Sequence, residues 1–426
     1  MLIFLYRAVW WLCTPILQAL LLYRANRGKE DRGRLSERYG YPMMARPDGA
    51  LLWLHAASVG EAQSALIFIH RILQENPNAH MLVTTGTVTS AQLMADKLPD
   101  CAFHRYAPMD HPLCIARFLK SWRPDAIFWM ESELWPHMLY KVKKYAIPAF
   151  LLNARLSARS FTRWSLVKGF STRLLSVFDI IFAQTKEAQA RYQALGAHKV
   201  IYSDNIKYSA APLAYHGQDL EALSKAIGQR PVWVYASTHA GEEALAAQAH
   251  EALRQKYPNL LTIIVPRHPQ RRDNIGRILE AKDVCFRGDN KALPHDQTQI
   301  YIADTLGELG LFYRLADIAM IGRSFSDDGG GGHNPIEAAQ LGCAVLSGKN
   351  MQYQQALFDE MVAHGCAKII ETKEKLADVL DDLLSNNNKC DDMVKAGQEF
   401  AKGKENIIDA VMCDITPILQ ENMKRG

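Results

Sequence analysis

Two consecutive α/β domains are the fold that this sequence predicts, and three observations lead to it. The chain has 426 residues, too many for one hydrophobic core and enough for two domains of roughly 150 to 200 residues each. Short apolar runs alternate with amphipathic helical stretches, which is typical of a parallel sheet with helices on both faces. The alternation stops in residues 205–218 and then starts again. We therefore expect two α/β domains of similar size, joined by a linker at this interruption.

The first stretch, residues 2–23, is almost wholly apolar and aromatic. A helix of this length spans the hydrocarbon core of a bilayer, and the basic residues behind it should hold the following chain in the cytoplasm. No small-residue cleavage site follows, so a retained anchor is favoured over a cleaved signal peptide. Arg7 and Pro15 interrupt the run, so a helix lying in the membrane interface and a first helix buried on the globular body are alternatives.

Strands are predicted where apolar and β-branched residues form short runs bounded by Pro, Gly, Asn or Asp. Before the interruption these runs are 50–55, 80–84, 126–130, 147–152, 180–183 and 199–202, and after it they are 232–236, 261–265, 284–287, 299–303, 317–321 and 344–346. Ligands of parallel sheets bind beyond the carboxyl ends of the strands, so we expect a ligand cleft between the domains. The last stretch, 402–423, has a helical pattern and could pack back across this cleft.

Composition and missing motifs narrow the function. Hydrophobic residues at 48% and charged residues at 22% are ordinary for a folded soluble protein, and a net charge of +4 argues against a nucleic-acid partner. The eight cysteines lack C-x-x-C and zinc-site spacing, so we expect reduced thiols in a cytosolic compartment. The dinucleotide, Walker A, G-x-S-x-G, H-E-x-x-H and D-x-D motifs are absent, which disfavours hydride transfer, ATP hydrolysis, serine or metalloprotease chemistry and a divalent-metal clamp.

Four consecutive glycines lead into a short helix in the segment 327–342, DDGGGGHNPIEAAQLG. Glycines let backbone N–H groups approach a ligand closely. Asn334 suits the N-cap, Pro335 the first helical position and Gly342 the position just past the helix end. Because a helix N-terminus favours anions, a phosphate site is predicted here. A flexible turn before an ordinary helix is the alternative.

The segment 57–61, ASVGE, follows the first strand of the sheet and opens a helix. A carboxylate at a strand end, such as Glu61, is well placed to take a proton from a substrate hydroxyl. Ser58 and Glu61 also have the spacing of a capping box, in which the glutamate only satisfies an N-terminal N–H. A first-turn position would then lower the pKa of Glu61 and make it a weaker base. Base and cap are both open from these residues alone.

Two further carboxylates, Glu131 and Glu133, follow the strand 126–130. One of them could act as a second acid or orient an acceptor, and the alternative is an ordinary surface loop. The tryptophans beside them, Trp129 and Trp135, are expected to serve packing and not as stacking platforms for a ligand.

Cations and a further turn are expected near the same cleft. Lys207 lies in the linker, and Arg267 and His268 follow the strand 261–265. These cations could neutralise a phosphate or carboxylate, although a lone linker lysine is usually solvated. The segment 304–309, DTLGEL, should turn N–H groups and a carboxylate toward the same opening.

Taken together and in this order behind an N-terminal anchor, four motifs closely resemble the bacterial 3-deoxy-D-manno-octulosonic acid (Kdo) transferases of lipopolysaccharide synthesis. They are 57–61, 131–135, 266–269 and 331–337. The resemblance implies a GT-B fold, with two Rossmann-like α/β/α domains facing across a cleft. Its domains would be 1–24 (membrane anchor helix), 25–206 (acceptor domain), 207–218 (linker) and 219–426 (donor domain). It also implies metal-independent transfer with inversion at the anomeric carbon.

The resemblance further assigns roles to single residues. It implies that Glu61 is the general base, and that Glu131 and Lys207 stabilise the transition state. The segments that would bind CMP contain Arg267, His268, Gly307, Glu308, Leu309, Asn334, Pro335, Ile336 and Glu337. Departing CMP carries its charge on a phosphate, which a helix starting at Asn334 could stabilise. The family often has proline after this glutamate, where this chain has Ala338.

The partners that the resemblance implies are CMP-Kdo as donor, a lipid A precursor (lipid IVA) as acceptor and the membrane surface, with no cofactor and no nucleic acid. The implied location is the bacterial inner membrane, with the catalytic domains on the cytoplasmic side. Two alternatives are a GT-B transferase that uses another nucleotide sugar and a non-catalytic, membrane-tethered nucleotide-binding protein. Binding of CMP rather than UDP separates the first, and a transfer assay separates the second.

Overall fold

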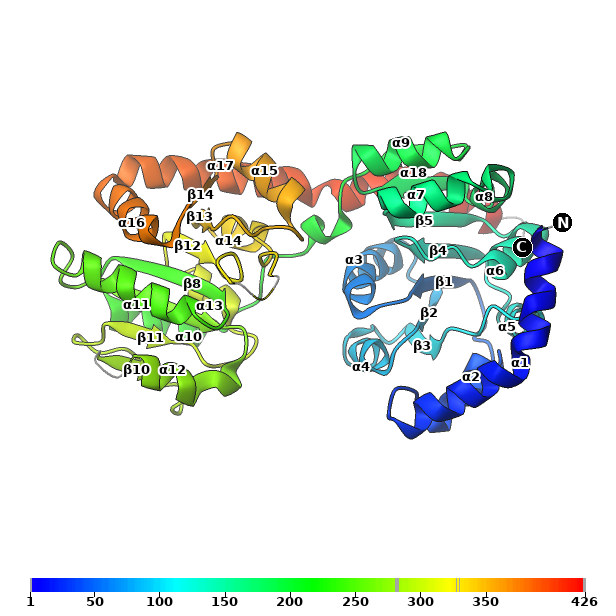
Figure 1. The fold of residues 1–426 in the computed structure, drawn as a ribbon, viewed down its shortest axis with the longest axis horizontal. Coiled ribbons are helices and arrows are strands. Elements are labelled where there is room, and N and C mark those ends of the chain that lie inside the picture. Colours follow the sequence, from blue (N-terminus) through cyan, green and yellow to red (C-terminus); the bar gives the residue numbers. More distant parts are fainter. Residues whose placement is uncertain (1, 280–282, 327, 329, 424–426) are drawn as a thin grey trace. The chain divides into compact units, whose positions relative to one another are not determined.

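A computed structural model of the chain describes residues 2–279, 283–326, 328 and 330–423. The chain forms two compact units (Figure 1). Unit 1 comprises Met1–Ala210 and Glu405–Gly426, and unit 2 comprises Ala211–Lys404. The last helix of the chain, α18 (Ile407–Met423), thus belongs to the same unit as the first.

The described part of unit 1 contains a parallel seven-stranded sheet of order β3-β2-β1-β4-β5-β6-β7. Its strands are β1 (Leu51–Ala56), β2 (His80–Thr85), β3 (Ala102–Tyr106), β4 (Ala126–Met130), β5 (Ala149–Ala154), β6 (Ile180–Ala183) and β7 (Val200–Tyr202). In register, Leu52 of β1 lies beside Met81 of β2 and Ala126 of β4. Every residue of β1 is buried, as expected for a central parallel strand covered on both faces.

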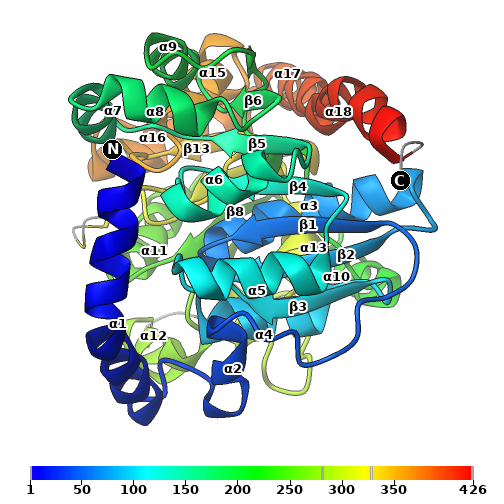
Figure 2. The ribbon, with the colours of Figure 1, turned by 90° about the vertical axis from the view of Figure 1, so that its right-hand side faces the viewer.

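Helices cover both faces of this sheet. They are α3 (Val59–Glu75), α4 (Val88–Lys97), α5 (Pro112–Trp122), α6 (Pro136–Lys144), α7 (Ala158–Ser165), α8 (Lys168–Leu175) and α9 (Lys186–Ala194), with the short α2 (Leu35–Arg38) at the edge. Figure 2 shows α5 and α6 in front of the strands. Trp53 and Trp129 pack with these helices, whereas Leu52 and Leu54 point to the other face and pack with α3 and α18.

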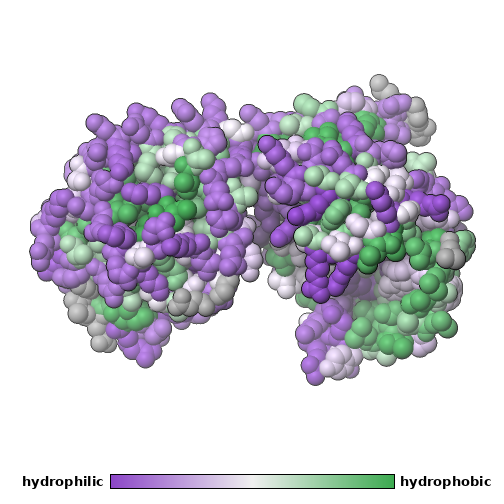
Figure 3. Space-filling model, turned by 45° about the horizontal axis from the view of Figure 1, so that its top comes forward, coloured by the Kyte–Doolittle hydropathy of each residue, from purple (hydrophilic) through white to green (hydrophobic). Residues whose placement is uncertain are grey.

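The N-terminal helix α1 (Leu2–Asn26) leaves most of its apolar side chains exposed. In the described part of the chain it is the one helix long and apolar enough to cross a membrane, and the apolar window of the helix is 0% buried. Phe4, Leu12 and Ile16 are 66%, 79% and 69% exposed. Figure 3 shows apolar side chains gathered on the side of unit 1 where α1 lies. The alternative of a first helix buried on the globular body is therefore wrong.

Unit 2 repeats the architecture with, among its described residues, a parallel seven-stranded sheet of order β10-β11-β9-β8-β12-β13-β14. The strands are β8 (Val232–Thr238), β9 (Leu261–Pro266), β10 (Val284–Phe286), β11 (Ile300–Ile302), β12 (Ile318–Ile321), β13 (Ala344–Ser347) and β14 (Ala367–Ile369). The helices are α10 (Gly217–Ile227), α11 (Glu242–Leu253), α12 (Arg272–Ile278), α13 (Leu309–Tyr313), α14 (Ile336–Gln340), α15 (Gln355–Ala363), α16 (Leu376–Ser385) and α17 (Asn387–Glu405). Trp233 and Met320 pack against α11 and α16 in its core.

The prediction of two parallel α/β sheets is confirmed, and every predicted strand is present. Two strands were not predicted, β3 and β14. His104 and Arg105 interrupt the apolar pattern of β3, and Lys368 interrupts that of β14. Both strands lie at an edge of their sheet and contain half-buried residues, so fewer of their side chains have to be apolar.

Candidate active site

Glu61 lies in the first turn of α3, at the carboxyl edge of the sheet in unit 1. Ser58 is the N-cap, and its hydroxyl oxygen accepts the N–H of Glu61 at 3.3 Å. The carboxylate of Glu61 accepts the Ala57 N–H at 2.8 Å and the Ser58 hydroxyl at 3.0 Å. The side chain therefore bonds to a backbone N–H in the manner of a cap, but to that of Ala57 and not to that of the N-cap residue itself.

Burial makes Glu61 more than a cap. The residue is 7% exposed, and desolvation raises the pKa of its carboxyl to about 7, with the charges of Glu131 and Glu133 adding to the increase. Hydrogen bonds from Ala57 and Ser58 oppose this shift without cancelling it. The expectation that a first-turn position lowers this pKa is wrong, because desolvation outweighs the helix end. A carboxylate with a pKa near 7 is well matched to taking a proton at neutral pH.

Glu131 follows β4 in a left-handed conformation, with φ of 54°. Its N–H donates to Leu152 of β5 at 2.9 Å, and its carbonyl accepts from Arg155 at 3.4 Å. A non-glycine residue at positive φ is strained, and surrounding bonds that hold such strain are typical of functional sites. The contribution of Glu131 to the pKa of Glu61 places the two carboxylates within electrostatic range of one another.

Two tryptophans fix the neighbouring Glu133. The indole N–H of Trp135 donates to the Glu133 carboxylate at 2.7 Å, and the indole N–H of Trp129 donates to its carbonyl. Both rings pack on His55 of β1, with ring centroids 4.5 Å (Trp129) and 4.8 Å (Trp135) away. The expectation that these tryptophans serve packing is confirmed, with Trp129 fully buried in the core and Trp135 partly buried against it, and their packing sets the loop that carries the carboxylates.

Lys207 belongs to unit 1, in the short 3-10 helix η2 (Ile206–Ser209). Its N–H donates to the side chain of Asn205 at 3.1 Å, and the preceding N–H of Ile206 donates to Asn153 at the end of β5 at 3.3 Å. A Cβ atom added to Gly60 would lie 3.8 Å from the Lys207 ammonium. The lysine thus lies beside Gly60 in the first turn of α3 and is not a freely solvated linker residue.

Unit 2 gathers imidazoles at the carboxyl edge of its sheet. His239 follows β8, and its Nε2 lies 3.1 Å from Nε2 of His333. The ring centroids of His239 and His268 are 5.7 Å apart. Burial, together with the charges of His239 and then Arg267, lowers the pKa of His333 to about 4, so its ring is neutral at pH 7. The structure therefore brings the predicted residues Arg267 and His268 together with His333.

Glu337 joins this cluster from α14. Asn334 donates to the Glu337 carboxylate at 3.0 Å, and burial raises the pKa of that carboxyl while Asn334 and Arg267 oppose the increase. The described helix is short, Ile336–Gln340, and its N-cap is Pro335, one residue later than predicted. The Asn334 side chain still accepts the Ile336 N–H at 3.3 Å. Gly342, with φ of 89°, lies just past the helix end as predicted.

The glycines before this helix serve packing. Gly331 and Gly332 have φ of 127° and 69°, and a Cβ on them would collide with Tyr353 and Met351. Packing inside the fold therefore also requires glycine at these two positions, apart from the predicted close approach of their backbone to a ligand. Two residues of the segment, Asp327 and Gly329, lie outside the described residues.

The turn at 307–309 presents less charge than expected. The Glu308 carboxylate accepts from the buried guanidinium of Arg287 at 2.9 Å and from the Thr305 hydroxyl. Gly307 has φ of 82°, and Leu309 starts α13. Because the Glu308 carboxylate is paired within the fold, the expectation that it faces the opening is wrong. What the turn offers to a ligand is its backbone N–H groups.

Glu242 is the residue that the sequence reasoning missed. It is 2% exposed in the first turn of α11, and its carboxylate accepts four backbone N–H groups. They come from His239 (2.9 Å), Arg323 (2.8 Å), Ser324 (3.2 Å) and Phe325 (3.1 Å). The signal was present, because H-A-G-E after β8 repeats the pattern of S-V-G-E after β1. Glu242 ties the imidazole cluster to the loop that follows β12.

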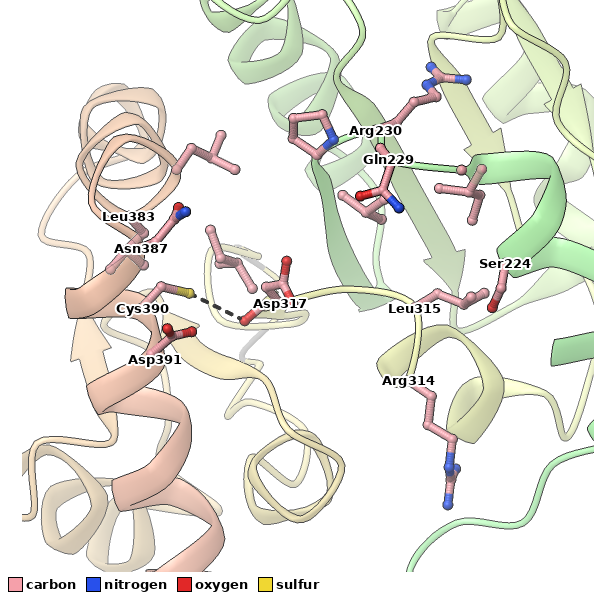
Figure 4. A pocket seen from close by; sticks show the side chains of 16 residues that line it. Ser224, Gln229, Arg230, Arg314, Leu315, Asp317, Leu383, Asn387, Cys390 and Asp391 are labelled. Atoms are coloured by element: carbon pink, nitrogen blue, oxygen red, sulfur yellow. Dashed lines mark hydrogen bonds between the residues drawn. The ribbon is translucent and has the colours of Figure 1, made fainter. Parts of the chain in front are cut away.

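A polar cavity of about 580 Å³ lies elsewhere in unit 2. Figure 4 shows Gln229, Arg230, Asp317 and Cys390 around it, with Cys390 Sγ 3.7 Å from the Asp317 carbonyl. Gln229 and Arg230 precede β8 and Asp317 precedes β12, so the cavity is at the amino edge of the sheet, opposite the imidazole cluster. Among the described residues, His, Cys, Asp and Glu side chains form no group of three or more that could hold a metal ion.

The fold defines the class. Residues of this chain superpose on a putative UDP-N-acetylglucosamine 2-epimerase from Listeria monocytogenes with a TM-score of 0.58 at 16% identity, covering 87% of this chain and 97% of that one. MurG of Acinetobacter baumannii superposes with a TM-score of 0.51 at 15% identity, covering 85% and 99%. Both likenesses concern the fold alone, and with two parallel α/β sheets this chain has the GT-B architecture.

Sequence relatives define the family within that class. A probable Kdo transferase, mitochondrial, of Arabidopsis thaliana is 34% identical over 433 residues, covering 99% of this chain and 96% of that protein. The Kdo transferase of Haemophilus influenzae is 32% identical over 426 residues, covering 99% of each. The family model described as 3-deoxy-D-manno-octulosonic-acid transferase (kdotransferase) matches residues 33–210. The chain belongs to the Kdo transferase family.

Proposed function

We propose that this protein transfers Kdo from CMP-Kdo to a lipid A precursor with inversion at the anomeric carbon, and that Glu61 is the general base. The observation that carries the proposal is a carboxyl at a strand end, 7% exposed, whose pKa burial raises to about 7. The acceptor hydroxyl gives its proton to Glu61 while its oxygen forms a bond to the anomeric carbon of Kdo. The bond from that carbon to the CMP phosphate breaks, and CMP leaves with the electron pair.

Charge on the leaving group needs a cationic environment, and unit 2 supplies one. Arg267 and His268 are exposed at the carboxyl end of β9, next to the imidazoles of His239 and His333. We assign the phosphate of CMP to Arg267 and His268, with the backbone N–H groups of Gly307–Leu309 and of Asn334 as further donors. Glu337, held by Asn334, is an acceptor for a ribose hydroxyl. A five-residue helix contributes little dipole, so the side chains carry most of this assignment.

Near the nucleophile, Lys207 and Glu131 balance the charge that develops as the proton moves. The Lys207 ammonium lies beside Gly60, from where it stabilises negative charge that develops in the transition state. Glu131, held at positive φ, is placed to stabilise positive charge on the sugar as the bond to phosphate stretches.

The exposed apolar face of α1 supports attachment to the bacterial inner membrane. Arg24 in the last turn of this helix and Arg27 and Lys29 just after it are basic, which favours the cytoplasmic side for the two units under the positive-inside rule. The acceptor would then be a lipid of the same membrane.

The test incubates the full-length protein with CMP-Kdo and lipid IVA in detergent and measures the product by mass. We expect one or more Kdo additions, loss of most turnover in Glu61→Gln, and normal turnover in Glu75→Gln, a matched change at the other end of α3. Unchanged turnover in Glu61→Gln would require another base. Turnover with a UDP-sugar, or CMP binding without product, would favour another transferase or a non-catalytic binding protein.

A further inference from the structure

An apolar cavity of about 400 Å³ lies within unit 1, between α1 and the carboxyl edge of its sheet. Tyr6, Trp10 and Leu21 of α1 line one side of it. The loops that follow β2, β3 and β4 line the other side, with Gly86, residues 107–110 and residues 134–136. Its volume is in the range of about 300 to 1,000 Å³ that is usual for small-molecule sites.

The charged groups in its wall are already satisfied by the fold. The Glu30 carboxylate is bonded to Arg38 at 2.8 Å and to Arg24 at 3.0 Å. Asp110 accepts the Tyr6 hydroxyl at 2.8 Å and two backbone N–H groups of α6, at 3.0 and 2.7 Å. What remains for an occupant is therefore the surface of aromatic rings, leucine, methionine and proline. Such a lining fits an apolar chain and offers little to a sugar or a peptide backbone.

The wall of this cavity is continuous with the loops around Glu61. Gly86 donates its N–H to the Ala57 carbonyl at 3.3 Å, and the Ala57 N–H holds the Glu61 carboxylate. Trp135, which lines the cavity, holds the Glu133 carboxylate. A chain lying in the cavity would thus be attached to a head group at the edge of the sheet where Glu61 lies.

The surroundings favour an amphipathic, anionic lipid as the occupant. The outer face of α1 is apolar and exposed, which suits acyl chains, and Arg24, Arg27 and Lys29 follow at its C-terminal end near Leu21. Basic residues beside an apolar cavity match a phosphorylated head group with a fatty acyl tail.

We propose that this cavity, formed by α1 and the loops after β2, β3 and β4, is a subsite for one fatty acyl chain of the lipid acceptor. The proposal rests on the proposed function, since it concerns the same acceptor. It makes α1 part of acceptor recognition in addition to its contact with the membrane.

The experiment measures kcat/KM for Kdo transfer in detergent to phosphorylated glucosamine disaccharides whose single acyl chain is lengthened stepwise. Each buried methylene should raise kcat/KM about fourfold until the cavity is full. Leu21→Trp and Met109→Trp fill the cavity from opposite walls, so the increase should stop at a shorter chain. Leu22→Trp makes the same change on the 58% exposed neighbour and should keep the wild-type dependence.

Three results would overturn the proposal, and each leads to a different conclusion about the cavity. A wild-type chain-length dependence in active Leu21→Trp and Met109→Trp proteins excludes the acyl subsite and leaves the transferase assignment intact. Absence of transfer by the wild-type protein to every acceptor removes the proposed function and the subsite with it. Loss of binding to acceptor-free phospholipid vesicles in these variants, with an unchanged chain-length dependence, identifies the occupant as bulk membrane lipid. A circular dichroism spectrum and a urea unfolding midpoint close to those of wild type show in each case that the variant is folded.

Discussion

Burial is the property that separates Glu61 from an ordinary helix-capping glutamate. Its two carboxylate oxygens accept bonds from Ala57 and Ser58, and both bonds favour the ionised form. Desolvation still wins and raises the pKa to about 7, so at neutral pH the protein holds a carboxylate that readily accepts a proton. The same hydrogen bonds fix its orientation, which a base needs as much as its pKa.

This raised pKa predicts that ionising Glu61 destabilises the protein. Between the ordinary value of 4.5 and about 7 the folded state binds more protons than the unfolded state, so the free energy of unfolding falls as pH rises through this window. Glu61→Gln removes that loss, and at pH 8 it should be more stable than wild type by roughly 3 kcal/mol. Below pH 4.5 the two should converge.

Chemical denaturation at several pH values measures the difference. Glu75→Gln, on the same helix but with a half-exposed side chain, is the matched control. A stability difference between Glu61→Gln and wild type that does not vary with pH would contradict a raised pKa at Glu61.

Glu242 gives a second prediction at this scale. Glutamine in its place keeps the shape but leaves only one oxygen to accept from the four N–H groups, so the His239 and Arg323 loops lose their fixed positions. We expect CMP binding to weaken about tenfold while the protein stays folded. Calorimetric titration with CMP measures it, and Glu251→Gln, half-exposed on the same helix, should bind normally. Normal binding by Glu242→Gln would exclude this positioning role.

The sequence predicted the positions of the candidate residues better than their surroundings. Glu61 and Arg267 follow strand ends, which alternation alone locates. The direction of the Glu61 pKa shift could not be predicted, because it depends on how much of the side chain the fold buries. Three of the four N–H groups that Glu242 accepts lie 81 to 83 residues away and become its neighbours only in the folded unit, so its role in holding these loops could not be predicted.

At the scale of elements, α18 completes the core of unit 1 from the far end of the chain. Ile408, Val411 and Ile415 pack in one cluster with Ala65 and Phe68 of α3. Strongly apolar strands were predictable from the sequence. Strands β3 and β14 were not, because polar residues interrupt their apolar pattern, and α14 begins one residue later than predicted.

Truncating a side chain of α18 should therefore destabilise unit 1. Ile415 is 0% exposed, and Ile415→Ala should lower the free energy of unfolding by about 2 to 4 kcal/mol through lost burial and a cavity. Urea denaturation of the full chain measures the loss, with Gln420→Ala, at an exposed position of the same helix, as control. An unchanged free energy of unfolding would mean that α18 adds nothing to this core.

The exposed face of α1 leads to a prediction about the membrane. A charge at Leu12 or Ile16, the most exposed apolar positions of the helix, must be brought into lipid at a cost of about 2.5 kcal/mol or more if the helix inserts. Leu12→Glu and Ile16→Glu should shift the protein from the membrane to the soluble fraction in flotation with anionic vesicles. Ile278→Glu, on an exposed apolar position of unit 2, should not. Full retention of both α1 variants on vesicles would contradict membrane contact by this face.

At the scale of the whole molecule, the proposed acceptor and donor sites belong to two different compact units. The base, Lys207 and the acyl cavity are in unit 1, whereas Arg267, His268 and the imidazole cluster are in unit 2. Each unit repeats one device, a parallel sheet whose first strand ends in a buried glutamate at the start of a helix, Glu61 in one and Glu242 in the other. One glutamate is assigned to proton transfer and the other to holding the loops of the donor site.

This division predicts that defects separate by substrate. Arg267→Ala should raise the KM for CMP-Kdo by about tenfold or more, since it removes a charge-assisted contact, and leave the KM for the lipid acceptor near normal. Steady-state kinetics with each substrate varied in turn measures both constants. An equal rise in both KM values would contradict assignment of Arg267 to the donor alone.

The central claim is that Glu61 takes the acceptor proton, and the pH dependence of kcat/KM for Kdo transfer tests it most directly. We predict that wild-type kcat/KM rises tenfold per pH unit below about pH 7 and levels off above it, because only the ionised carboxylate is a base. Glu61→Gln should lose this rise together with most of its activity. A wild-type profile that is flat through pH 7, or a Glu61→Gln profile with the same break, would contradict the claim.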